Sequence, residues 1–312
     1  MKNMETNIYD LIIIGSGSAG LTAGIYASRY KLKTLIIGKI NGGLMTESHK
    51  ICNFPTEEDI TGLDLSEKME KNAIAQGAKI INKEITNITE ADGLFTISSS
   101  DNMKFVSRSI ILAYGTIHRH LGLPWEKELL GKGISYCATC DGMFFKNKTV
   151  AVIGGSDSAL TSALYLADIA DKVYLIYRGE KLRGEPAWIE NINQSKNIEI
   201  LLDSQVTELI GENKLEKIKI SNGTHLEVNG LFIEIGTEPI SYDFIKNLKI
   251  NTDEKGYIEV DQAQQTSRAG IWAAGDLTTG SNNFRQIITA CAEGAIAAEN
   301  IFKYLKTNET LL

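Results

Sequence analysis

Two stretches of the chain follow the same plan of apolar strand, glycine-rich turn, helix and second apolar strand. The first begins at Asp10 with DLIIIGSGSAG, and the second begins at Thr149 with TVAVIGGSDSA. Each has the order and approximate length of a βαβ unit, and each opens on a continuous apolar run, as in a parallel sheet covered by helices on both faces. A chain of 312 residues has room for about two domains. The sequence therefore predicts an α/β protein with two Rossmann-like, doubly wound, three-layer nucleotide-binding domains.

Charge and hydropathy limit which binding partners and which cellular location can be expected for the protein. The 32 Lys and Arg residues are outnumbered by 39 Asp and Glu residues, for a net charge of −7, whereas binding to nucleic acid or to an anionic membrane usually requires a basic face. No stretch approaches the roughly 18–20 uninterrupted apolar residues of a membrane-spanning helix. The polar N-terminus also lacks the regions of a secretory signal. We therefore expect no nucleic-acid or membrane partner, and a cytoplasmic location.

The first glycine-rich turn is a complete G-x-G-x-x-G motif, made by Gly15, Ser16, Gly17, Ser18, Ala19 and Gly20. Between a strand and a helix, Gly15 permits the tight turn, Gly17 leaves room for a pyrophosphate, and Gly20 lets the helix pack closely. Such turns also serve packing alone, but this context favours dinucleotide binding. Gly38 stands where an Asp or Glu would hold a ribose hydroxyl at the end of the next strand. The motif therefore leaves the identity of the dinucleotide open.

A second polar position follows a late apolar strand, in the run Ala273, Ala274, Gly275 and Asp276. The Asp276 carboxylate could accept hydrogen bonds from the ribityl hydroxyls of a flavin, or it could serve as a turn or N-cap residue. Taken with the first glycine-rich turn, the pattern favours a flavin dinucleotide.

The four cysteines include one pair in a C-x-x-C arrangement, Cys137 and Cys140, followed directly by Asp141. Such a pair can form a small, exchangeable disulfide, and a neighbouring carboxyl group can move a proton to a leaving thiolate. A zinc site would need further ligands at suitable spacing, and two merely buried cysteines would need no acidic neighbour. Redox chemistry is therefore favoured, and Cys52 and Cys291 are expected to be small core residues.

At this point the chain resembles the low-molecular-weight thioredoxin reductases, a class of FAD-dependent pyridine nucleotide-disulfide oxidoreductases. The resemblance rests on GISYCATCDGMFF at 133–145 followed by VAVIGG, on GSGSAG at 15–20, and on further short matches in the same order along nearly the whole chain. Those further matches are Gly42-Gly43, Asn53-Phe54-Pro55, AAGD at 273–276 and Arg285-Gln286.

The resemblance implies a discontinuous FAD-binding domain, at 1–118 and 245–312, and an inserted NAD(P)H-binding domain, at 119–244, that carries the cysteines. It implies that Cys140 faces the flavin, that Cys137 attacks the disulfide of a thioredoxin-type protein, and that Asp141 donates the proton. It also implies a homodimer and two alternating domain orientations, with hinges near 118–120 and 243–246. The residues expected at the FAD are Gly15, Ser16, Gly17, Ser18, Ala19, Gly20, Gly38, Gly42, Gly43, Leu44, Asn53, Ala113, Gly115, Gly275, Asp276, Arg285, Gln286 and Ile287.

The second glycine-rich turn departs from the family pattern. Its expected nucleotide-binding residues are Gly154, Gly155, Ser156, Asp157 and Ser158, with Arg178 and Arg183 for the 2′-phosphate of NADPH. Ser156 replaces a glycine that gives a pyrophosphate close approach, and Gly179 replaces the second arginine of a His-Arg-Arg run. Losing one charge-assisted phosphate contact costs about 1.5–3 kcal/mol. Tyr114 replaces a threonine, and its ring could crowd a cofactor or stack on it.

These departures leave the electron donor open among NADPH, which is favoured, NADH, and ferredoxin or a deazaflavin. Three functions are compatible with these residues: a thioredoxin reductase-like enzyme, a small-molecule dithiol oxidase that passes electrons to oxygen, and a flavoprotein redox sensor. The intact C-x-x-C with its acidic neighbour favours the first. Two tests follow: Cys140→Ser should abolish disulfide reduction while FAD stays bound, and Gly179→Arg should lower the apparent NADPH constant.

Overall fold

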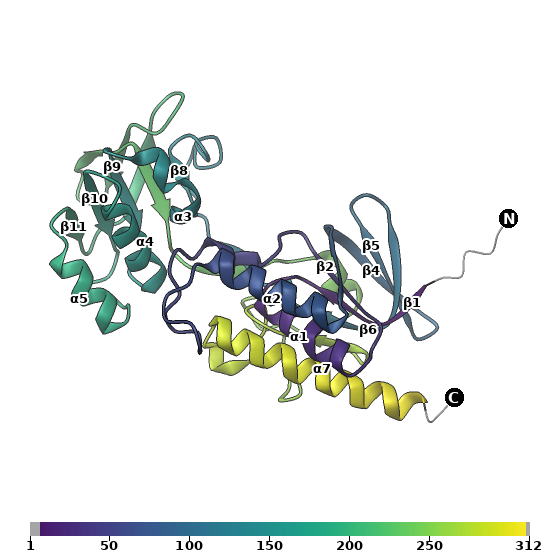
Figure 1. Ribbon diagram of the computed structural model, residues 1–312. Helices are drawn as coiled ribbons and strands as arrows, with labels where there is room; N and C mark the ends of the chain where they lie inside the picture. The colour runs from purple at the N-terminus through teal and green to yellow at the C-terminus, as the bar shows by residue number, and fades with distance from the viewer. Residues whose placement is uncertain (1–6, 310–312) are drawn as a thin grey trace. The chain divides into compact units, whose positions relative to one another are not determined.

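The computed structural model describes residues 7–309, which divide into two compact units (Figure 1). Within the described residues, unit 1 comprises 7–46, 51–117 and 238–309, and unit 2 comprises 47–50 and 118–237. The main part of unit 2 is thus inserted in the chain between two parts of unit 1. Strands β7 (Thr116–His118) and β16 (Thr237–Pro239) pair with each other where the chain passes between the units.

Unit 1 is built on a seven-stranded sheet with the order β3-β2-β1-β6-β5-β4, in which β17 also pairs with β6. The pairs β1–β2, β2–β3, β1–β6 and β6–β17 are parallel, and β4 and β5 form an antiparallel extension beside β6. The strands are β1 (Ile8–Ile14), β2 (Thr34–Gly38), β3 (Lys79–Asn82), β4 (Ile85–Ala91), β5 (Leu94–Ser99), β6 (Lys104–Leu112) and β17 (Ile271–Ala273); the helices are α1 (Ser18–Arg29), α2 (Gly62–Gln76), α6 (Asp243–Asn247) and α7 (Ile287–Glu309), with short 3-10 turns η1 (Gly43–Glu47) and η3 (Ser281–Asn283).

Successive side chains of a strand point to opposite sides, so the apolar run of β1 places apolar side chains on both faces of the sheet, and both faces are buried. Leu11 and Ile13 belong to the cluster that includes apolar side chains of α1 and α7, whereas Ile12 and Ile14 belong to the cluster on the opposite face. Figure 1 shows α1, α2 and α7 running together along the sheet. The continuous run read from the sequence is therefore the central strand of a sheet covered on both sides.

Unit 2 repeats this plan in a five-stranded sheet of order β11-β10-β9-β15-β8, in which every pairing is parallel. A separate three-stranded antiparallel sheet, β12-β13-β14, packs its apolar side chains into the core of this unit. The elements are β8 (Ile134–Ser135), α3 (Ala138–Asp141), η2 (Gly142–Phe145), β9 (Thr149–Ile153), α4 (Asp157–Ala167), β10 (Lys172–Ile176), α5 (Pro186–Gln194), β11 (Ile198–Leu201), β12 (Val206–Ile210), β13 (Lys217–Ile220), β14 (His225–Glu227) and β15 (Gly230–Ile233). The predicted α/β class, with two parallel-sheet nucleotide-binding folds, is confirmed.

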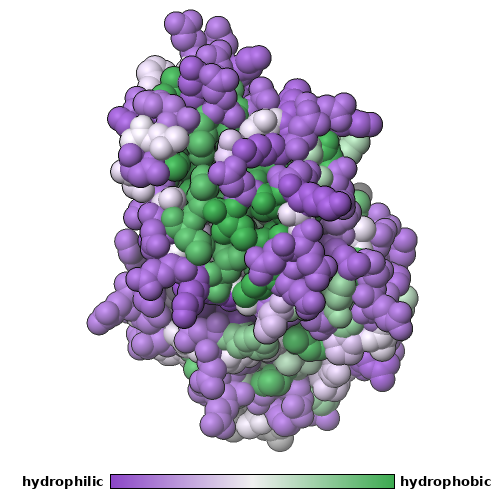
Figure 2. Space-filling model, turned by 90° about the vertical axis from the view of Figure 1, so that its left-hand side faces the viewer, coloured by the Kyte–Doolittle hydropathy of each residue, from purple (hydrophilic) through white to green (hydrophobic). Residues whose placement is uncertain are grey.

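The surface of the described residues is mostly hydrophilic in the view of Figure 2. No helix among residues 7–309 combines the length and the apolar character needed to cross a bilayer. The face drawn in Figure 2 also exposes a central band of apolar surface. Unit 2 itself contains several large apolar side chains that are exposed, namely Trp125, Leu130, Met143, Phe144 and Leu202.

Candidate active site

Cys137 and Cys140 form a disulfide, with their Cα atoms 5.3 Å apart. They lie in the connection between β8 and β9 of unit 2, where Cys137 is the N-cap of the one-turn helix α3 and Cys140 lies within it. The backbone N–H of Cys140 points at the Cys137 sulfur, at 3.1 Å, so a negative charge on that sulfur would be stabilised. Cys140 is exposed and Cys137 half-buried. The two sulfurs are therefore bonded to each other, as the redox interpretation predicts.

Asp141, the residue after the pair, is held by a serine that the sequence reasoning overlooked. The hydroxyl of Ser135 lies 2.7 Å from the Oδ2 atom of Asp141 and accepts the backbone N–H of Cys137 at 3.0 Å. Ser135 is 3% exposed, whereas Asp141 is half-buried. A single buried hydroxyl thus connects the carboxylate to the backbone of the first cysteine.

The glycines of the first turn are required by close backbone contacts at Gly15 and Gly20. Gly15 has a φ of +116°, and a Cβ there would lie 2.0 Å from the carbonyl oxygen of Ala113. A Cβ at Gly20 would lie 2.0 Å from the carbonyl oxygen of Gly15, so any side chain would push α1 away from the turn. These two positions serve the fold whether or not a nucleotide is present.

Gly17 differs from both, because space opens beside it. A Cβ at Gly17 would meet one atom within 4 Å, the carbonyl oxygen of Gly42 at 3.8 Å. Gly43 lies across this space, with a would-be Cβ 3.5 Å from the Cα of Gly17, and Gly115 also faces open space. The fold does not require a glycine at position 17, because a Cβ would have room there. A bound pyrophosphate would require one, because the missing side chain leaves the backbone N–H groups of the turn accessible. The turn therefore fits a flavin dinucleotide.

Gly38 is explained by the side chain of Ser16. A Cβ at Gly38 would lie 2.0 Å from the Ser16 hydroxyl oxygen, and that hydroxyl donates to the carbonyl oxygen of Ile40 at 3.0 Å. The position where many dinucleotide folds place an acidic residue is thus packed against the turn itself.

The loop that carries Asp276 is fixed by the buried carboxylate of Glu293, on α7. Glu293 accepts the backbone N–H of Gly275 at 2.7 Å and the hydroxyls of Thr278 and Ser281 at 3.1 and 2.6 Å. Burial, opposed by Arg285 and assisted by Glu293, raises the pKa of Asp276 to about 6. Among residues 7–309 no hydrogen-bond donor to the Asp276 carboxylate is found. A half-buried acceptor without a donor fits the ribityl hydroxyls of a flavin.

Arg285 and Gln286 are neighbours in sequence but contact different loops of unit 1. The Arg285 guanidinium donates to the carbonyl oxygen of Asp276 at 3.1 Å and lies over the ring of Tyr257. Gln286 accepts the side-chain N–H of Asn53 at 3.1 Å, which joins two expected FAD residues that are far apart in sequence. The remaining expected residues surround these turns: Ser18 and Ala19 begin α1, Leu44 lies in η1, Ala113 follows β6, and Ile287 begins α7.

The ring of Tyr114 packs against two other aromatic rings. Its ring packs edge-on against Tyr242, with centroids 4.9 Å apart, and against Phe244, and burial raises the pKa of its hydroxyl. Tyr114 is therefore partly buried and packs against the core of unit 1.

In the second glycine-rich turn, a tyrosine ring occupies the space beside the glycines. A Cβ at Gly155 would lie 2.5 Å from Cγ of the buried Tyr177 ring, and one at Gly179 would lie 2.7 Å from its Cε1 atom. Ser156 is the N-cap of α4 but makes no side-chain capping bond, and the Asp157 carboxylate is engaged by the backbone N–H of Glu185 at 2.6 Å. The turn is thus packed more tightly than its sequence indicated.

The two expected phosphate-binding arginines are both exposed. Arg183 donates its backbone N–H to the carbonyl oxygen of Gly155 at 2.6 Å, and its guanidinium lies 5.5 Å from the centroid of the Tyr177 ring. Arg178 directly follows Tyr177 at the end of β10. Both residues lie in the segment that follows β10, and the backbone contact with Gly155 brings Arg183 to the turn.

The expectation for the other cysteines was wrong for Cys52. Ile51 is buried in a bridge with Ile60, so the next residue points outward, and Cys52 is exposed. Cys291, on α7, is half-buried, and burial raises the pKa of its thiol.

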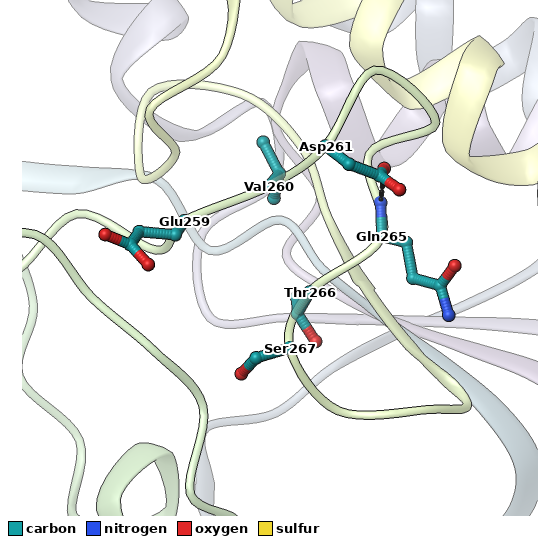
Figure 3. Close-up of a pocket in the computed structure, with 6 residues that line it drawn as sticks. All are labelled: Glu259, Val260, Asp261, Gln265, Thr266 and Ser267. Carbon is teal, nitrogen blue, oxygen red and sulfur yellow. Dashed lines mark hydrogen bonds between the residues drawn. The ribbon is translucent and has the colours of Figure 1, made fainter.

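One open pocket of about 350 Å³ lies in a loop of unit 1, and none of the expected site residues lines it (Figure 3). Its polar groups serve the loop itself: the Asp261 carboxylate accepts the backbone N–H groups of Ala263 and Gln265, and the Thr266 hydroxyl donates to the backbone. We assign it no part in the redox chemistry. Its lining residues are Glu259, Val260, Asp261, Gln265, Thr266 and Ser267.

Comparisons with known proteins agree with this geometry. The family model described as pyridine nucleotide-disulphide oxidoreductase matches residues 9–294. The thioredoxin reductase of Listeria monocytogenes is 38% identical, over 97% of this chain and 95% of that protein. The solved thioredoxin reductase of Lactococcus lactis has a TM-score of 0.91 at 37% identity, covering 96% of this chain and 99% of that one.

A solved structure with a different donor in its name is also similar. The ferredoxin-flavin thioredoxin reductase of Clostridium acetobutylicum is 30% identical, with a TM-score of 0.52, covering 96% of this chain and 99% of that one. The resemblance stated from the sequence is confirmed. With a bonded C-x-x-C pair in a parallel-sheet unit and matches along nearly its whole length, the chain belongs to the pyridine nucleotide-disulphide oxidoreductases, in the family of the thioredoxin reductases.

Proposed function

We propose that this protein is a FAD-dependent reductase of a thioredoxin-type protein disulfide. The observation that carries the proposal is the Cys137–Cys140 disulfide, with Asp141 beside it, in a chain of this family. Electrons would pass from a reductant to FAD, from FAD to this disulfide, and from the resulting dithiol to the partner. We place FAD in the domain formed by 1–118 and 245–312, and a nicotinamide nucleotide in the domain at 119–244.

The FAD site would use the open turn at Gly17 and Gly43 for the pyrophosphate, and Asp276 for the ribityl chain. The accessible backbone at Gly17 and the undonated carboxylate of Asp276 support this assignment. Asn53, Gln286 and Arg285 would hold the surrounding loops in place. When bound, the flavin supplies the two electrons that reduce the disulfide.

In the exchange with the partner, one cysteine attacks and the other later closes the disulfide again. The family resemblance gives the attack to Cys137 and contact with the flavin to Cys140, whereas Cys140 is the more exposed residue in this structure. The N–H of Cys140 directed at the Cys137 sulfur favours a thiolate on Cys137, so we propose that Cys137 attacks. Asp141 would give a proton to the departing sulfur.

A protein partner would meet an apolar surface next to the redox pair. Met143 and Phe144 follow the C-x-x-C by a few residues and are 61% and 73% exposed. Large apolar side chains that are this exposed beside a reactive group are typical of an interaction site. This supports a thioredoxin or a thioredoxin-like protein as substrate. A homodimer and a location in the reducing cytoplasm belong to the same proposal.

For the electron donor, NADPH remains the first proposal, because Arg178 and Arg183 are both exposed and Arg183 contacts the second glycine-rich turn at Gly155. A protein donor such as reduced ferredoxin is the second candidate. It is favoured by the Tyr177 ring, which fills the space beside both Gly155 and Gly179. A deazaflavin or NADH would be alternatives within the same test.

Two measurements test the function. Anaerobic bleaching of the bound flavin by NADPH, NADH, reduced ferredoxin and a reduced deazaflavin, run in parallel, identifies the donor. Single Cys137→Ser and Cys140→Ser variants, reduced and mixed with oxidised thioredoxin, identify the attacking sulfur, because Cys140→Ser should accumulate a mixed disulfide at Cys137. Protein that binds no flavin on reconstitution, or a wild-type enzyme that consumes oxygen with a small dithiol but leaves thioredoxin oxidised, would overturn the proposal.

A further inference from the structure

We propose that Ser135 is a positioning residue that holds Asp141 ready for proton transfer during disulfide exchange. The inference rests on the proposed function, since it assigns a role in the reaction of the Cys137–Cys140 pair. It concerns a residue on β8, two positions before the first cysteine.

The geometry leaves the Ser135 hydroxyl one preferred arrangement. Its oxygen accepts the backbone N–H of Cys137 at 3.0 Å, and its hydrogen has two acceptors in reach. The Oδ2 atom of Asp141 lies at 2.7 Å and the carbonyl oxygen of Cys137 at 3.2 Å. A hydroxyl has one hydrogen, and a short bond to a carboxylate is the stronger choice. The hydroxyl therefore donates to Asp141.

The surroundings of Ser135 make this contact a fixed one. Ser135 is 3% exposed, on a strand that pairs in parallel with β15 through a register of Ser135 with Phe232. Water cannot readily replace a hydroxyl at such a site, so the Asp141 side chain keeps one orientation relative to the backbone of Cys137. Within the described chain, hydrogen bonds to Asp141 are found at Oδ2 but not at Oδ1. The Oδ1 atom is thus left for the reaction.

The exchange requires two protons to be delivered. One thiolate of the reduced pair attacks the partner disulfide, a new S–S bond forms, the partner's S–S bond breaks, and the departing partner sulfur takes one proton. The second cysteine gives its proton to Asp141 and attacks the first, which restores the Cys137–Cys140 bond and releases the other partner sulfur, and Asp141 passes the second proton to that sulfur. The partner gains two electrons, which the dithiol loses. A carboxyl group held at the end of α3 keeps a proton donor near the departing sulfur. The hydrogen bond from Ser135 holds the carboxyl group there.

The test is a double-mutant cycle with Ser135→Ala, Asp141→Asn and the combined variant, in the flavin-loaded enzyme. We expect Ser135→Ala to lower the rate of thioredoxin reduction about tenfold, as for loss of one hydrogen bond to a charged group. In the Asp141→Asn background the same change should have little further effect, because its target is gone. Ser135→Thr, which keeps the hydroxyl, should recover most of the rate. The pH profile of Ser135→Ala should shift toward that of Asp141→Asn.

Two further readouts keep the test decisive. Flavin content and the rate of flavin reduction should match wild type in Ser135→Ala, so that a general loss of structure is recognised; if that variant does not fold, Ser135→Gly removes the hydroxyl in its place. Exchange of the disulfide with dithiothreitol needs neither flavin nor thioredoxin, so it tests Ser135 even if the proposed function fails. Equal, additive effects of the serine change in both backgrounds, or a normal rate in Ser135→Ala, would overturn the inference.

Discussion

The guanidinium of Arg285 lies 3.9 Å from the centroid of the Tyr257 ring and donates to the carbonyl oxygen of Asp276. These two contacts attach the charged side chain of Arg285 to the loop that carries Asp276, within unit 1. Arginine on an aromatic face contributes about 0.5–2 kcal/mol, and its hydrogen bonds add to this.

Removing the Arg285 contacts should weaken flavin binding. We expect Arg285→Ala to weaken FAD binding about tenfold, measured by flavin release during gel filtration and by titration of the stripped protein. Arg268→Ala is the matched control, because Arg268 forms an exposed ion pair with Glu90 in the same unit and such pairs contribute about 0–1 kcal/mol. Equal flavin loss in both variants would contradict a specific role for the Arg285 contacts.

The first glycine-rich turn separates glycines needed by the fold from one needed by the ligand. Gly15→Ala should prevent folding, since its Cβ would lie 2.0 Å from a carbonyl oxygen at a φ of +116°. Gly17→Ala should fold with a normal melting temperature but lose FAD affinity by about tenfold or more, because the methyl group takes the place of the pyrophosphate. Gly77→Ala, at the open C-cap of α2, should cost about 1 kcal/mol of stability and leave flavin binding unchanged. Full FAD affinity in Gly17→Ala would remove the turn from the binding site.

The raised pKa of Asp276 predicts a pH dependence of stability in the flavin-free protein. Burial raises this pKa from an ordinary 3.8 to about 6, so the folded state binds the proton more tightly than the unfolded state. The contribution is therefore fully present below about pH 4 and is lost as the pH rises through 6, by roughly 3 kcal/mol at pH 8. Asp276→Asn should escape this loss, so its free energy of unfolding in urea should rise relative to wild type between pH 4 and pH 8. Asp92→Asn, in an exposed turn, is the control. Parallel curves for Asp276→Asn and wild type would show that burial does not disfavour the charge.

The contact between Tyr177 and Gly179 changes the design of the donor-specificity experiment. An arginine at 179 would place its Cβ 2.7 Å from the Tyr177 ring, so Gly179→Arg alone should lower the melting temperature and improve NADPH binding little. Combined with Tyr177→His, it should lower the apparent NADPH constant by about tenfold or more in stopped-flow flavin reduction. The charge-reversed control is Tyr177→His with Gly179→Glu, which should weaken NADPH binding. A similar gain in both double variants would mean that this segment does not read the 2′-phosphate.

Patterns confined to short stretches were read correctly from the sequence. The two glycine-rich units and the C-x-x-C pair each depend on neighbours within a few residues, and the structure contains two parallel-sheet units and a Cys137–Cys140 disulfide. Helix α2, Gly62–Gln76, likewise follows local signals, because it begins at the Thr61 N-cap and ends at Gly77 with a φ of 109°. Such signals are local, so they need no knowledge of the packed structure.

Contacts between distant residues were missed for the complementary reason. Glu293 binds the Gly275 loop from a helix 18 residues further along, and Tyr257 approaches Arg285 from another loop. Nothing in either residue's neighbourhood in the sequence indicates these partners. Ser135 was within reach of sequence reasoning, because it lies two residues before Cys137 and a hydroxyl at that distance can bond its own backbone.

The close packing of α1 against α7 has a consequence for how the protein is made. Gly294 of α7 touches the backbone of Ala19 so closely that a Cβ would lie 2.2 Å from its carbonyl oxygen. The turn at Gly15–Gly20 is synthesised early, but Gly294, which packs against it, follows Ala19 by 275 residues (294 − 19). Most of unit 2, by contrast, is one continuous stretch and can mature while translation continues. The segment that carries Cys137 and Cys140 is thus synthesised before α7, which the turn at Gly15–Gly20 packs against.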